Sequence, residues 1–367
     1  MDSDVLLVLV VATALAFDFT NGFHDTANVV ATSISTRALR PRAAVAIAAV
    51  LNFVGAFLSL EVAATVASGI VDADAVTLQV IFAGLVGAIV WNLVTWYAGL
   101  PSSSSHALIG GVVGAVLAAS GPSAVLGEGL LGKVFVPALV APVLAFAVAG
   151  IAIIVAYRVV GRQRPGPVTR GFRTGQIISG SLLALAHGTN DAQKTMGIIT
   201  LALVAHGTLG ADNPEVPFWV VVSAAAAIAL GTYCGGWRII RTMGSRIIKM
   251  DAAQGFTAQS SGAAVILAAT HAGFPLSTTH VISGAVMGSG AAKRLSAVRW
   301  GVAGNIAVAW VLTIPAAGST GAVVYAVSSV FGAGLVGPLL IGALLFAGLI
   351  ALGLSRIRQT PPAPEPT

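Results

Sequence analysis

Two polar segments that lie far apart in the chain carry side chains able to bind a cation. Residues 21–28 read NGFHDTAN, and residues 187–194 read HGTNDAQK. Carboxylate and amide oxygens are hard ligands suited to a small cation, and a buried carboxylate can instead carry a proton. The candidate cation-binding residues are Asn21, Asp25, Asn28, Asn190, Asp191 and Gln193.

Two hydroxyl-rich segments offer the opposite chemistry. PSSSSH covers residues 101–106 and PLSTTH covers 275–280, and an apolar stretch follows each of them. Proline suits the first turn of a helix, and serine or threonine caps its N-terminus. Free N–H groups, hydroxyl donors and the positive end of the helix dipole then form an anion site. Two such termini facing each other suit a tetrahedral oxyanion, and simple capping of two short helices is the alternative.

Titratable groups accompany both kinds of segment. Lys194 could contact the anion or neutralise Asp191, and the histidines could relay protons or donate to the anion. For His106 and His280, a hydrogen bond between the two halves of the chain is the alternative. The candidates for a proton or charge role are His24, His106, His187, Lys194 and His280.

The composition places these segments in a membrane protein. The 367 residues are 56% hydrophobic and only 9% charged, whereas an ordinary soluble domain carries about 25% charged residues. Most of the 19 Lys and Arg lie in short clusters between apolar runs. The net charge of +6 therefore reflects membrane orientation and not nucleic-acid binding. The single cysteine, Cys234, excludes a disulfide framework and a thiolate metal site.

The apolar runs predict an all-α polytopic membrane protein with about 10–12 membrane segments, since a full span needs about 20 residues. Several runs that border the polar segments are shorter than that. We therefore expect broken or re-entrant helices there, because irregular backbone at membrane depth is tolerated where it lines a cavity. The basic clusters predict cytoplasmic loops of a multi-pass protein of the cell membrane, with the N-terminus outside.

The two halves of the chain repeat each other. Asp25 matches Asp191, and the segment around His106 matches the segment around His280, in the same order. The first half starts outside and the second starts at a basic, inside connection, so we expect the repeats to be inverted. Glycines spaced for close helix packing recur in both halves, namely Gly110, Gly114, Gly284 and Gly288.

Inverted repeats with interrupted helices indicate a secondary transporter whose site lies at the repeat interface. Carboxylates beside an anion site would repel the anion unless a cation binds too, so the cation would be the coupling ion. An intramembrane enzyme would need an activated nucleophile or a metal cluster, and the sequence offers neither, so we predict that the protein is not an enzyme. The predicted regions are an N-terminal transmembrane repeat (1–157), a basic cytoplasmic linker (158–173), a C-terminal inverted transmembrane repeat (174–355) and a cytoplasmic proline-rich tail (356–367).

FTNGFHDTANVVATSIST, HGTNDAQKTMGIITLAL and PLSTTHVISGAVMG resemble the inorganic phosphate transporter (PiT) family, specifically its bacterial low-affinity branch. The resemblance covers roughly residues 5–355 and implies an inverted-repeat membrane fold. It also implies uptake of inorganic phosphate coupled to a cation gradient, with ion and substrate bound by the two Asn-Asp segments. The phosphate ligands that it implies are Ser103, Ser104, Ser105, Ser277, Thr278 and Thr279.

The sequence departs from the sodium-coupled members of that family, which are similar to GANDVANA in both copies. His24 occupies an Asn position of the first copy, and Gln193 and Lys194 end the second. This favours proton coupling, with a magnesium–phosphate complex as a further form of the cargo, and leaves sodium open. We expect no cofactor and no fixed metal; the expected partners are phosphate, the coupling cation and the lipid bilayer. A homodimer and another tetrahedral oxyanion such as sulfate remain open.

Overall fold

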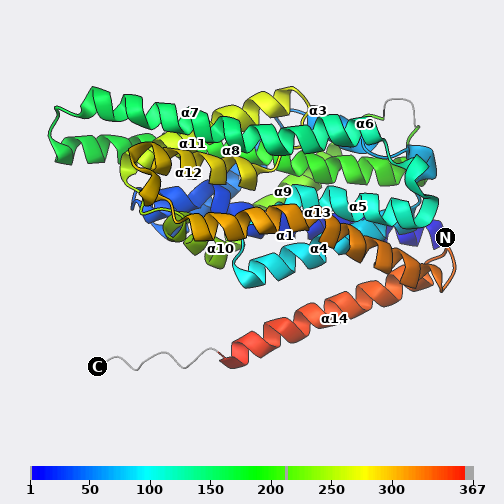
Figure 1. The fold of residues 1–367 in the computed structure, drawn as a ribbon. Coiled ribbons are helices and arrows are strands. Elements are labelled where there is room, and N and C mark those ends of the chain that lie inside the picture. Colours follow the sequence, from blue (N-terminus) through cyan, green and yellow to red (C-terminus); the bar gives the residue numbers. More distant parts are fainter. Residues whose placement is uncertain (1, 211–213, 360–367) are drawn as a thin grey trace.

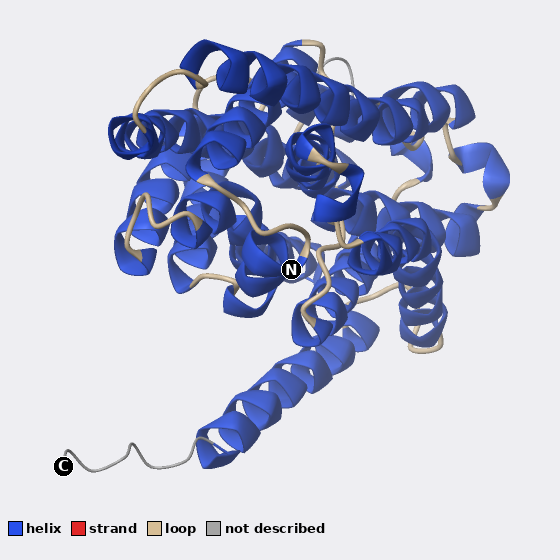
Figure 2. Ribbon diagram, turned by 60° about the vertical axis from the view of Figure 1, so that its left-hand side comes forward, coloured by secondary structure: helices blue, strands red, loops and turns tan. Residues whose placement is uncertain are grey.

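The computed structural model describes residues 2–210 and 214–359, and this part of the chain is helical almost throughout. Figure 2 shows helices joined by short loops. Within the described residues, the only strand-like pairing is an isolated bridge between Val71 and Val125. These observations confirm the all-α fold class.

The described residues of the first half, which ends at residue 160, contain seven α-helices. They are α1 (Asp2–Ser35), α2 (Pro41–Gly55), α3 (Glu61–Ser68), α4 (Leu78–Ala98), α5 (Ser104–Ser120), α6 (Gly127–Leu130) and α7 (Val136–Val160). The short segments η1 (Ala73–Ala75) and η2 (Pro122–Ala124) are 3-10 turns, and η3 (Leu131–Phe135) is a π-helical turn.

The described residues of the second half contain seven more α-helices. They are α8 (Pro165–Ala205), α9 (Phe218–Cys234), α10 (Trp237–Arg241), α11 (Ala252–His271), α12 (Thr278–Lys293), α13 (Trp300–Ser329) and α14 (Val336–Gln359). A π-helical turn, η4 (Thr242–Arg246), follows α10, and a 3-10 turn, η5 (Leu295–Ala297), precedes α13.

The helices of the two halves exchange partners in the bundle of Figure 1. Helix α1 packs along α9 of the second half, and α8 packs along α2 of the first. In the same way, α5 packs on α13 and α12 packs on α7. If α8 is the repeat of α1, then the pair α8–α2 is the repeat of the pair α1–α9. Likewise, if α12 is the repeat of α5, the pair α12–α7 is the repeat of the pair α5–α13. This arrangement supports the predicted internal repeat.

Glycines allow close approach at the crossings of α5 with α13 and of α12 with α7. A Cβ atom on Gly114 would lie 2.1 Å from a backbone carbonyl oxygen of α13, and one on Gly288 would lie 2.1 Å from a carbonyl oxygen of α7. The corresponding distances are 2.8 Å for Gly110 and 2.4 Å for Gly284. Because real Cβ atoms do not approach an oxygen so closely, the helix-packing role predicted for these four glycines is confirmed.

Two hydrophobic clusters form the core, and α1 and α8 run through both of them. One cluster contains Phe17 of α1 and Ala192 of α8, together with buried residues of α3, α4, α5 and α9. The other contains Ala27 of α1 and Leu183 of α8, together with residues of α2, α7, α11 and α12. The two polar segments of the sequence therefore lie at the boundary between the clusters.

The expectation that α1 and α8 are broken at the polar segments is wrong. Helix α1 is continuous through residues 21–28, and α8 is continuous through residues 187–194. A polar side chain does not require an interrupted backbone, because the helix satisfies its own N–H and C=O groups. The interruptions lie instead at residues 99–103, between α4 and α5, and at 272–277, between α11 and α12.

Four helical stretches of the described chain are long and apolar enough to cross a membrane: Asp2–Ser35, Leu78–Ala98, Gly127–Val160 and Trp300–Ser329. Helix α9 and the segment after it, bent by 59°, add a fifth. Helices α2 and α5 are apolar but shorter than a full span. The fold is therefore that of a multi-pass protein, with fewer full-length spans by this test than the predicted number of membrane segments.

The predicted linker is shorter in the structure than in the sequence prediction. Helix α7 continues to Val160 and α8 begins at Pro165, so most of residues 158–173 is helical.

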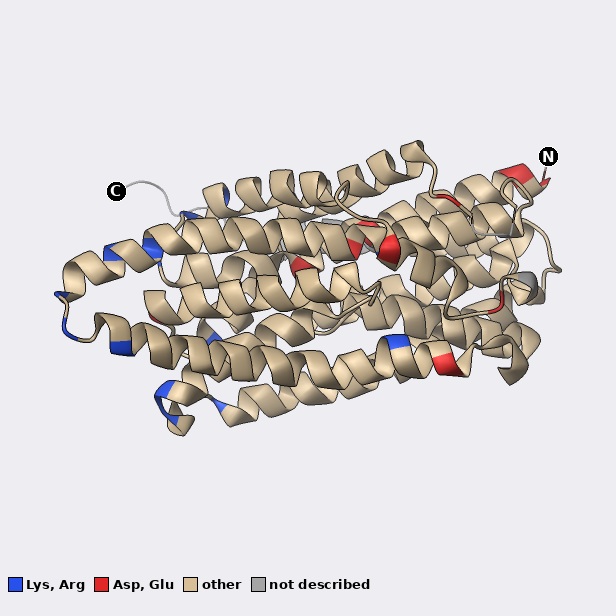
Figure 3. Ribbon diagram, turned by 90° about the horizontal axis from the view of Figure 1, so that it is seen from above, with Lys and Arg blue, Asp and Glu red and all other residues tan. Residues whose placement is uncertain are grey.

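Most Lys and Arg gather at the end of the bundle where α7 connects to α8, whereas the acidic residues lie mainly in its middle and toward the end that holds the N-terminus (Figure 3). Helix α14 diverges from the bundle (Figure 1), and the last part of the predicted tail, 360–367, lies outside the described residues.

Candidate functional site

The N-termini of α5 and α12 point into the polar boundary between the two hydrophobic clusters. Ser103 caps α5 and Ser277 caps α12, each accepting a hydrogen bond from the backbone N–H of the histidine three residues later. The hydroxyl groups of the next residues, Ser104 and Thr278, donate to side chains of α1. The predicted pair of capped helix N-termini is thus present, and both termini meet the same helix.

Asp25 is the acidic centre of the first polar segment. Its Oδ1 lies 2.6 Å from Nδ1 of His24, and its Oδ2 accepts a hydrogen bond of 2.8 Å from Ser104. The Ser104 hydroxyl also lies 2.6 Å from Oδ1 of Asn21. His24 is held from its other side, where Nε2 lies 3.0 Å from Oγ1 of Thr95. The first segment and the start of α5 therefore form one hydrogen-bonded cluster.

Asp191 is the acidic centre of the second segment, and it is paired with Lys194. The lysine Nζ lies 2.5 Å from Oδ1 of the aspartate and also donates to Ser105 at 2.6 Å and to the backbone oxygen of Leu276 at 2.7 Å. His187 Nε2 lies 3.2 Å from Oδ2 of Asp191. Lys194 neutralises the acid, which is one of the two roles considered for it from the sequence. It also ties the start of α5 and the segment before α12 to α8.

Thr278 joins the two halves of the cluster. Its hydroxyl lies 3.4 Å from Oδ2 of Asp25 and 3.3 Å from Oδ2 of Asp191. Next to it, Asn28 donates to Thr279 at 2.9 Å. The cluster brings one ligand atom each of Asp25, His187 and Asp191 within 4.8 Å of one another, and all three residues are buried. Such a group of oxygen and nitrogen atoms could hold a cation.

Two of the candidate cation residues turn away from this cluster. Gln193 accepts hydrogen bonds from the backbone N–H groups of Val62 and Ala63, at 2.8 and 3.1 Å, and so caps the start of α3. The amide nitrogen of Asn190 donates to Thr270 of α11, at 2.8 Å. Gln193 lies two residues from Asp191, so the period of the helix places it on another face of α8. Asn190 shares a face with His187 and Lys194, but its amide nitrogen is held by Thr270 and the backbone oxygen of Phe274.

His106 and His280 contact each other and not the acidic groups. Their rings meet edge to face with centroids 4.7 Å apart, and His280 stacks on Trp310 at 4.0 Å. Neither ring nitrogen of His280 has a hydrogen-bond partner among the described residues. The contact across the two halves is therefore present as a ring contact, without the hydrogen bond considered from the sequence.

The sequence prediction missed polar residues that support the cluster from apolar helices. Thr95 and Ser102 bond each other at 2.8 Å beside His24, and Asn52 of α2 lies 3.2 Å from Nδ1 of His187. Asn52 also donates to Thr232 of α9, at 2.8 Å. A polar residue inside an apolar run is a signal for such a role, but the partner cannot be identified without the fold.

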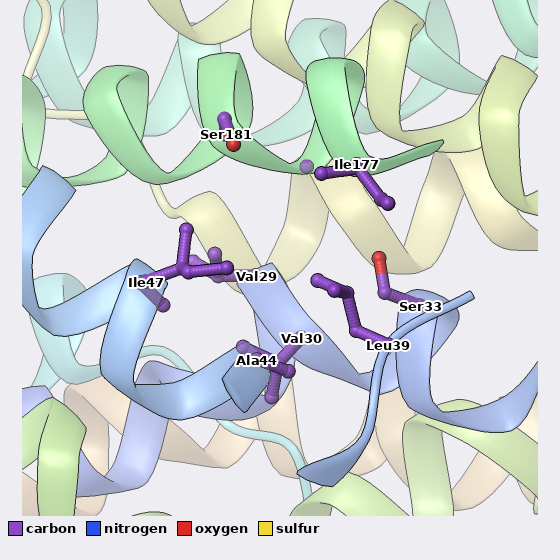
Figure 4. Close-up of a pocket in the computed structure, with 10 residues that line it drawn as sticks. Val29, Val30, Ser33, Leu39, Ala44, Ile47, Ile177 and Ser181 are labelled. Carbon is purple, nitrogen blue, oxygen red and sulfur yellow. The ribbon is translucent and has the colours of Figure 1, made fainter. Parts of the chain in front are cut away.

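A cavity lies between this cluster and the basic end of the bundle. It is lined by α1 residues that follow Asn28, including Val29 and Ser33, by residues of α2 such as Ile47, and by Ile177 and Ser181 of α8. Figure 4 shows these side chains on facing helices. The cluster provides hydroxyl groups and helix N-termini for an anion and carboxylates for a cation, and none of these groups lines the cavity.

Comparisons with known proteins agree with this chemistry. The model of the phosphate transporter family matches residues 21–321. A probable low-affinity inorganic phosphate transporter of Mycobacterium bovis is 55% identical over 356 residues, which are 97% of this chain and 85% of that protein. Proteins of the same description in Rhizobium meliloti and Bacillus subtilis are 54% and 45% identical, over 87% and 88% of this chain and 96% of each relative.

A solved structure described as the sodium-dependent phosphate transporter is similar in fold. It matches with a TM-score of 0.80 at 25% identity, over 89% of this chain and 99% of that one. The matched family and relatives are transporters and not enzymes, as the sequence predicted. On these grounds, the chain belongs to the phosphate transporter family.

Proposed function

We propose that the protein imports inorganic phosphate across the cell membrane by symport with a cation. The observation that carries this proposal is the meeting of two capped helix N-termini, through Ser104 and Thr278, with the buried carboxylates of Asp25 and Asp191. Phosphate transport itself follows from the family and its relatives. The symport and its residues are the new part.

Phosphate binds, in this proposal, between the starts of α5 and α12. The first N–H groups of a helix have no partner within it, and the dipole favours an anion there. Four hydroxyl groups, those of Ser104, Ser105, Thr278 and Thr279, lie on these first turns and take part in the cluster. Ser103 and Ser277 support the site indirectly, because their side chains cap the helices that carry it.

The coupling cation in this proposal is a proton. Each central carboxylate already has a basic neighbour, since His24 lies 2.6 Å from Asp25 and Lys194 lies 2.5 Å from Asp191. These groups occupy oxygen atoms that a metal ion would need. Histidine is the side chain whose proton affinity lies nearest physiological pH, so a His–Asp pair suits a proton better than sodium.

Sodium coupling is the second candidate, and two observations favour it. The structure with the similar fold is described as sodium-dependent. The ligand atoms of Asp25, His187 and Asp191 also lie within 4.8 Å of one another, which suits a cation between them. The same three groups could hold magnesium carried together with phosphate.

Uptake by the purified protein in proteoliposomes tests the proposal. Radiolabelled phosphate is offered with an inward proton gradient in sodium-free buffer, and then with an inward sodium gradient at constant pH. We expect accumulation with the proton gradient, and unlabelled phosphate should compete with it far better than sulfate. Uptake that strictly requires sodium would show that sodium, and not the proton, is the coupling cation. Equal competition by sulfate would contradict phosphate as the specific substrate.

A further inference from the structure

Asp18 of α1 is a buried acid that the site described above does not use. Its side chain has no solvent exposure, and among the described residues only Asn21 and Thr195 lie near enough to donate to its carboxylate. Asp18, Asn21 and Asp25 are spaced by three and four residues, so they lie on one face of α1. A buried carboxylate without a positively charged partner of its own is costly.

The neighbours of Asp18 are oxygen-bearing side chains. Asn21 lies beside it on α1, and Thr195 faces it from α8. The hydroxyl of Thr195 is buried, and among the described residues it faces no acceptor other than Asp18. Oδ1 of Asn21 and Oδ2 of Asp25 lie 2.6 and 2.8 Å from the Ser104 hydroxyl, whose single proton serves either of them. Asp18 and Thr195 are thus linked to the central cluster by one amide and one hydroxyl.

The charge of Asp18 is not compensated by the protein. The other buried acids, Asp25 and Asp191, lie beside His24 and Lys194 respectively. Helices α4 and α9, which pack against α1, contain no Asp, Glu, Lys or Arg. The charged groups of α8 that face Asp18 are Asp191 and Lys194, which already form an ion pair with each other. Among the described residues, none supplies a positive charge to Asp18 alone, so a proton or cation from outside would neutralise it.

We propose that Asp18, Asn21 and Thr195 form a separate site for one monovalent cation that moves together with phosphate. The inference rests on the proposed symport and adds to it a second charge-carrying group, besides the His24–Asp25 pair. The cation is a proton or a sodium ion, because either one neutralises a carboxylate among oxygen atoms. The repeat gives the site no second copy, since the matching positions are Ala184 and Val29.

The test compares two activities of the same proteoliposomes. Gradient-driven accumulation of labelled phosphate needs the coupling charge, whereas exchange of labelled for unlabelled phosphate at equal concentrations does not. Asp18→Asn imitates the neutral, cation-loaded state. We expect exchange within about twofold of the wild type and a loss of accumulation of at least about tenfold, the size of a missing charged interaction.

Two threonine variants on α8 provide a matched pair. Thr195→Val removes the hydroxyl that faces Asp18, and Thr200→Val removes a buried hydroxyl that only bonds the backbone of its own helix. We expect the first to require severalfold more of the driving cation for half-maximal uptake, and the second to leave it unchanged. Applying the proton and sodium gradients separately identifies which cation the site takes.

The outcomes separate this inference from the proposed function. A wild-type protein that moves no phosphate contradicts the proposed function and not the placement of the cation. If Asp18→Asn accumulates phosphate like the wild type, the proposed cation site is wrong. It is also wrong if the variant is present at normal amounts but has lost both exchange and accumulation. If Asp18→Asn does not reach the membrane, identical behaviour of Thr195→Val and Thr200→Val overturns it instead.

Discussion

At the scale of single residues, the hydroxyl of Thr278 holds the central position, because it lies within 3.4 Å of both acidic centres. We expect Thr278→Val to raise the phosphate concentration for half-maximal uptake at least about tenfold, since a hydrogen bond to a charged group is worth about 1.5–3 kcal/mol. Initial rates of uptake measure this. Thr257→Val, which removes a buried hydroxyl bonded only within α11, should change nothing. If half-saturation is unchanged in Thr278→Val, the hydroxyl segment before α12 only caps that helix and does not bind phosphate.

Asp25 allows a second prediction at this scale. Asp25→Asn keeps the shape of the side chain but removes the charge shared by His24, Ser104 and Thr278. We expect the variant to stay in the membrane and to lose gradient-driven accumulation, because the His–Asp pair can no longer carry the coupling proton. Accumulation at the wild-type rate, measured at equal protein content, would make Asp25 a structural residue.

Much of the residue chemistry could be predicted from the sequence. The motifs placed Asp25, Asp191 and Lys194 together, because duplicated polar residues in apolar helices have few other uses. The period of the helix places Gln193 on another face than Asp191, but the partner of Asn190 could not be predicted, since it depends on how α11 packs against α8. The same holds for Thr95 and Asn52, which become neighbours of the histidines only through the packing of α4 and α2.

At the scale of elements, the hydroxyl segments predicted the half-helices α5 and α12 correctly. Proline, serine and threonine act locally, so their effect can be read from the sequence. The continuity of α1 and α8 was not predicted, because the partners that satisfy their polar side chains come from helices distant in the chain. The sequence prediction started the second repeat at residue 174, which is too late for its first helix. Helix α8 begins at Pro165, because proline is tolerated in the first turn of a helix.

The helix crossings provide a prediction for the elements. Gly114→Ala and Gly288→Ala should each lower the thermal unfolding temperature in detergent, because the added methyl group meets a carbonyl oxygen and overpacking costs about 1–3 kcal/mol. Gly304→Ala serves as the control, since it lies in α13 with nothing within 4 Å of the added carbon. It should be neutral or slightly stabilising. Equal unfolding temperatures for all three variants would contradict the close packing.

At the scale of the whole molecule, the separation of charges in Figure 3 predicts the orientation in the membrane. Positively charged loops face the cytoplasm. In a Cys234→Ser background, Gln163→Cys lies at the basic end, and Ser123→Cys lies between α5 and α6 at the opposite end. We expect an impermeant thiol reagent to label Ser123→Cys in intact cells, and Gln163→Cys only after permeabilisation. The reverse labelling pattern would show that the basic end faces outward and would contradict the predicted orientation.

The position of bound phosphate tests the central claim most directly. An experimental structure in lipid nanodiscs, determined with saturating phosphate and again without it, shows where the anion binds. The account predicts density between the first turns of α5 and α12, within hydrogen-bonding distance of Ser104 and Thr278 and beside Asp25 and Asp191. Phosphate density that appears only elsewhere, for example among the arginines at the basic end, would contradict it.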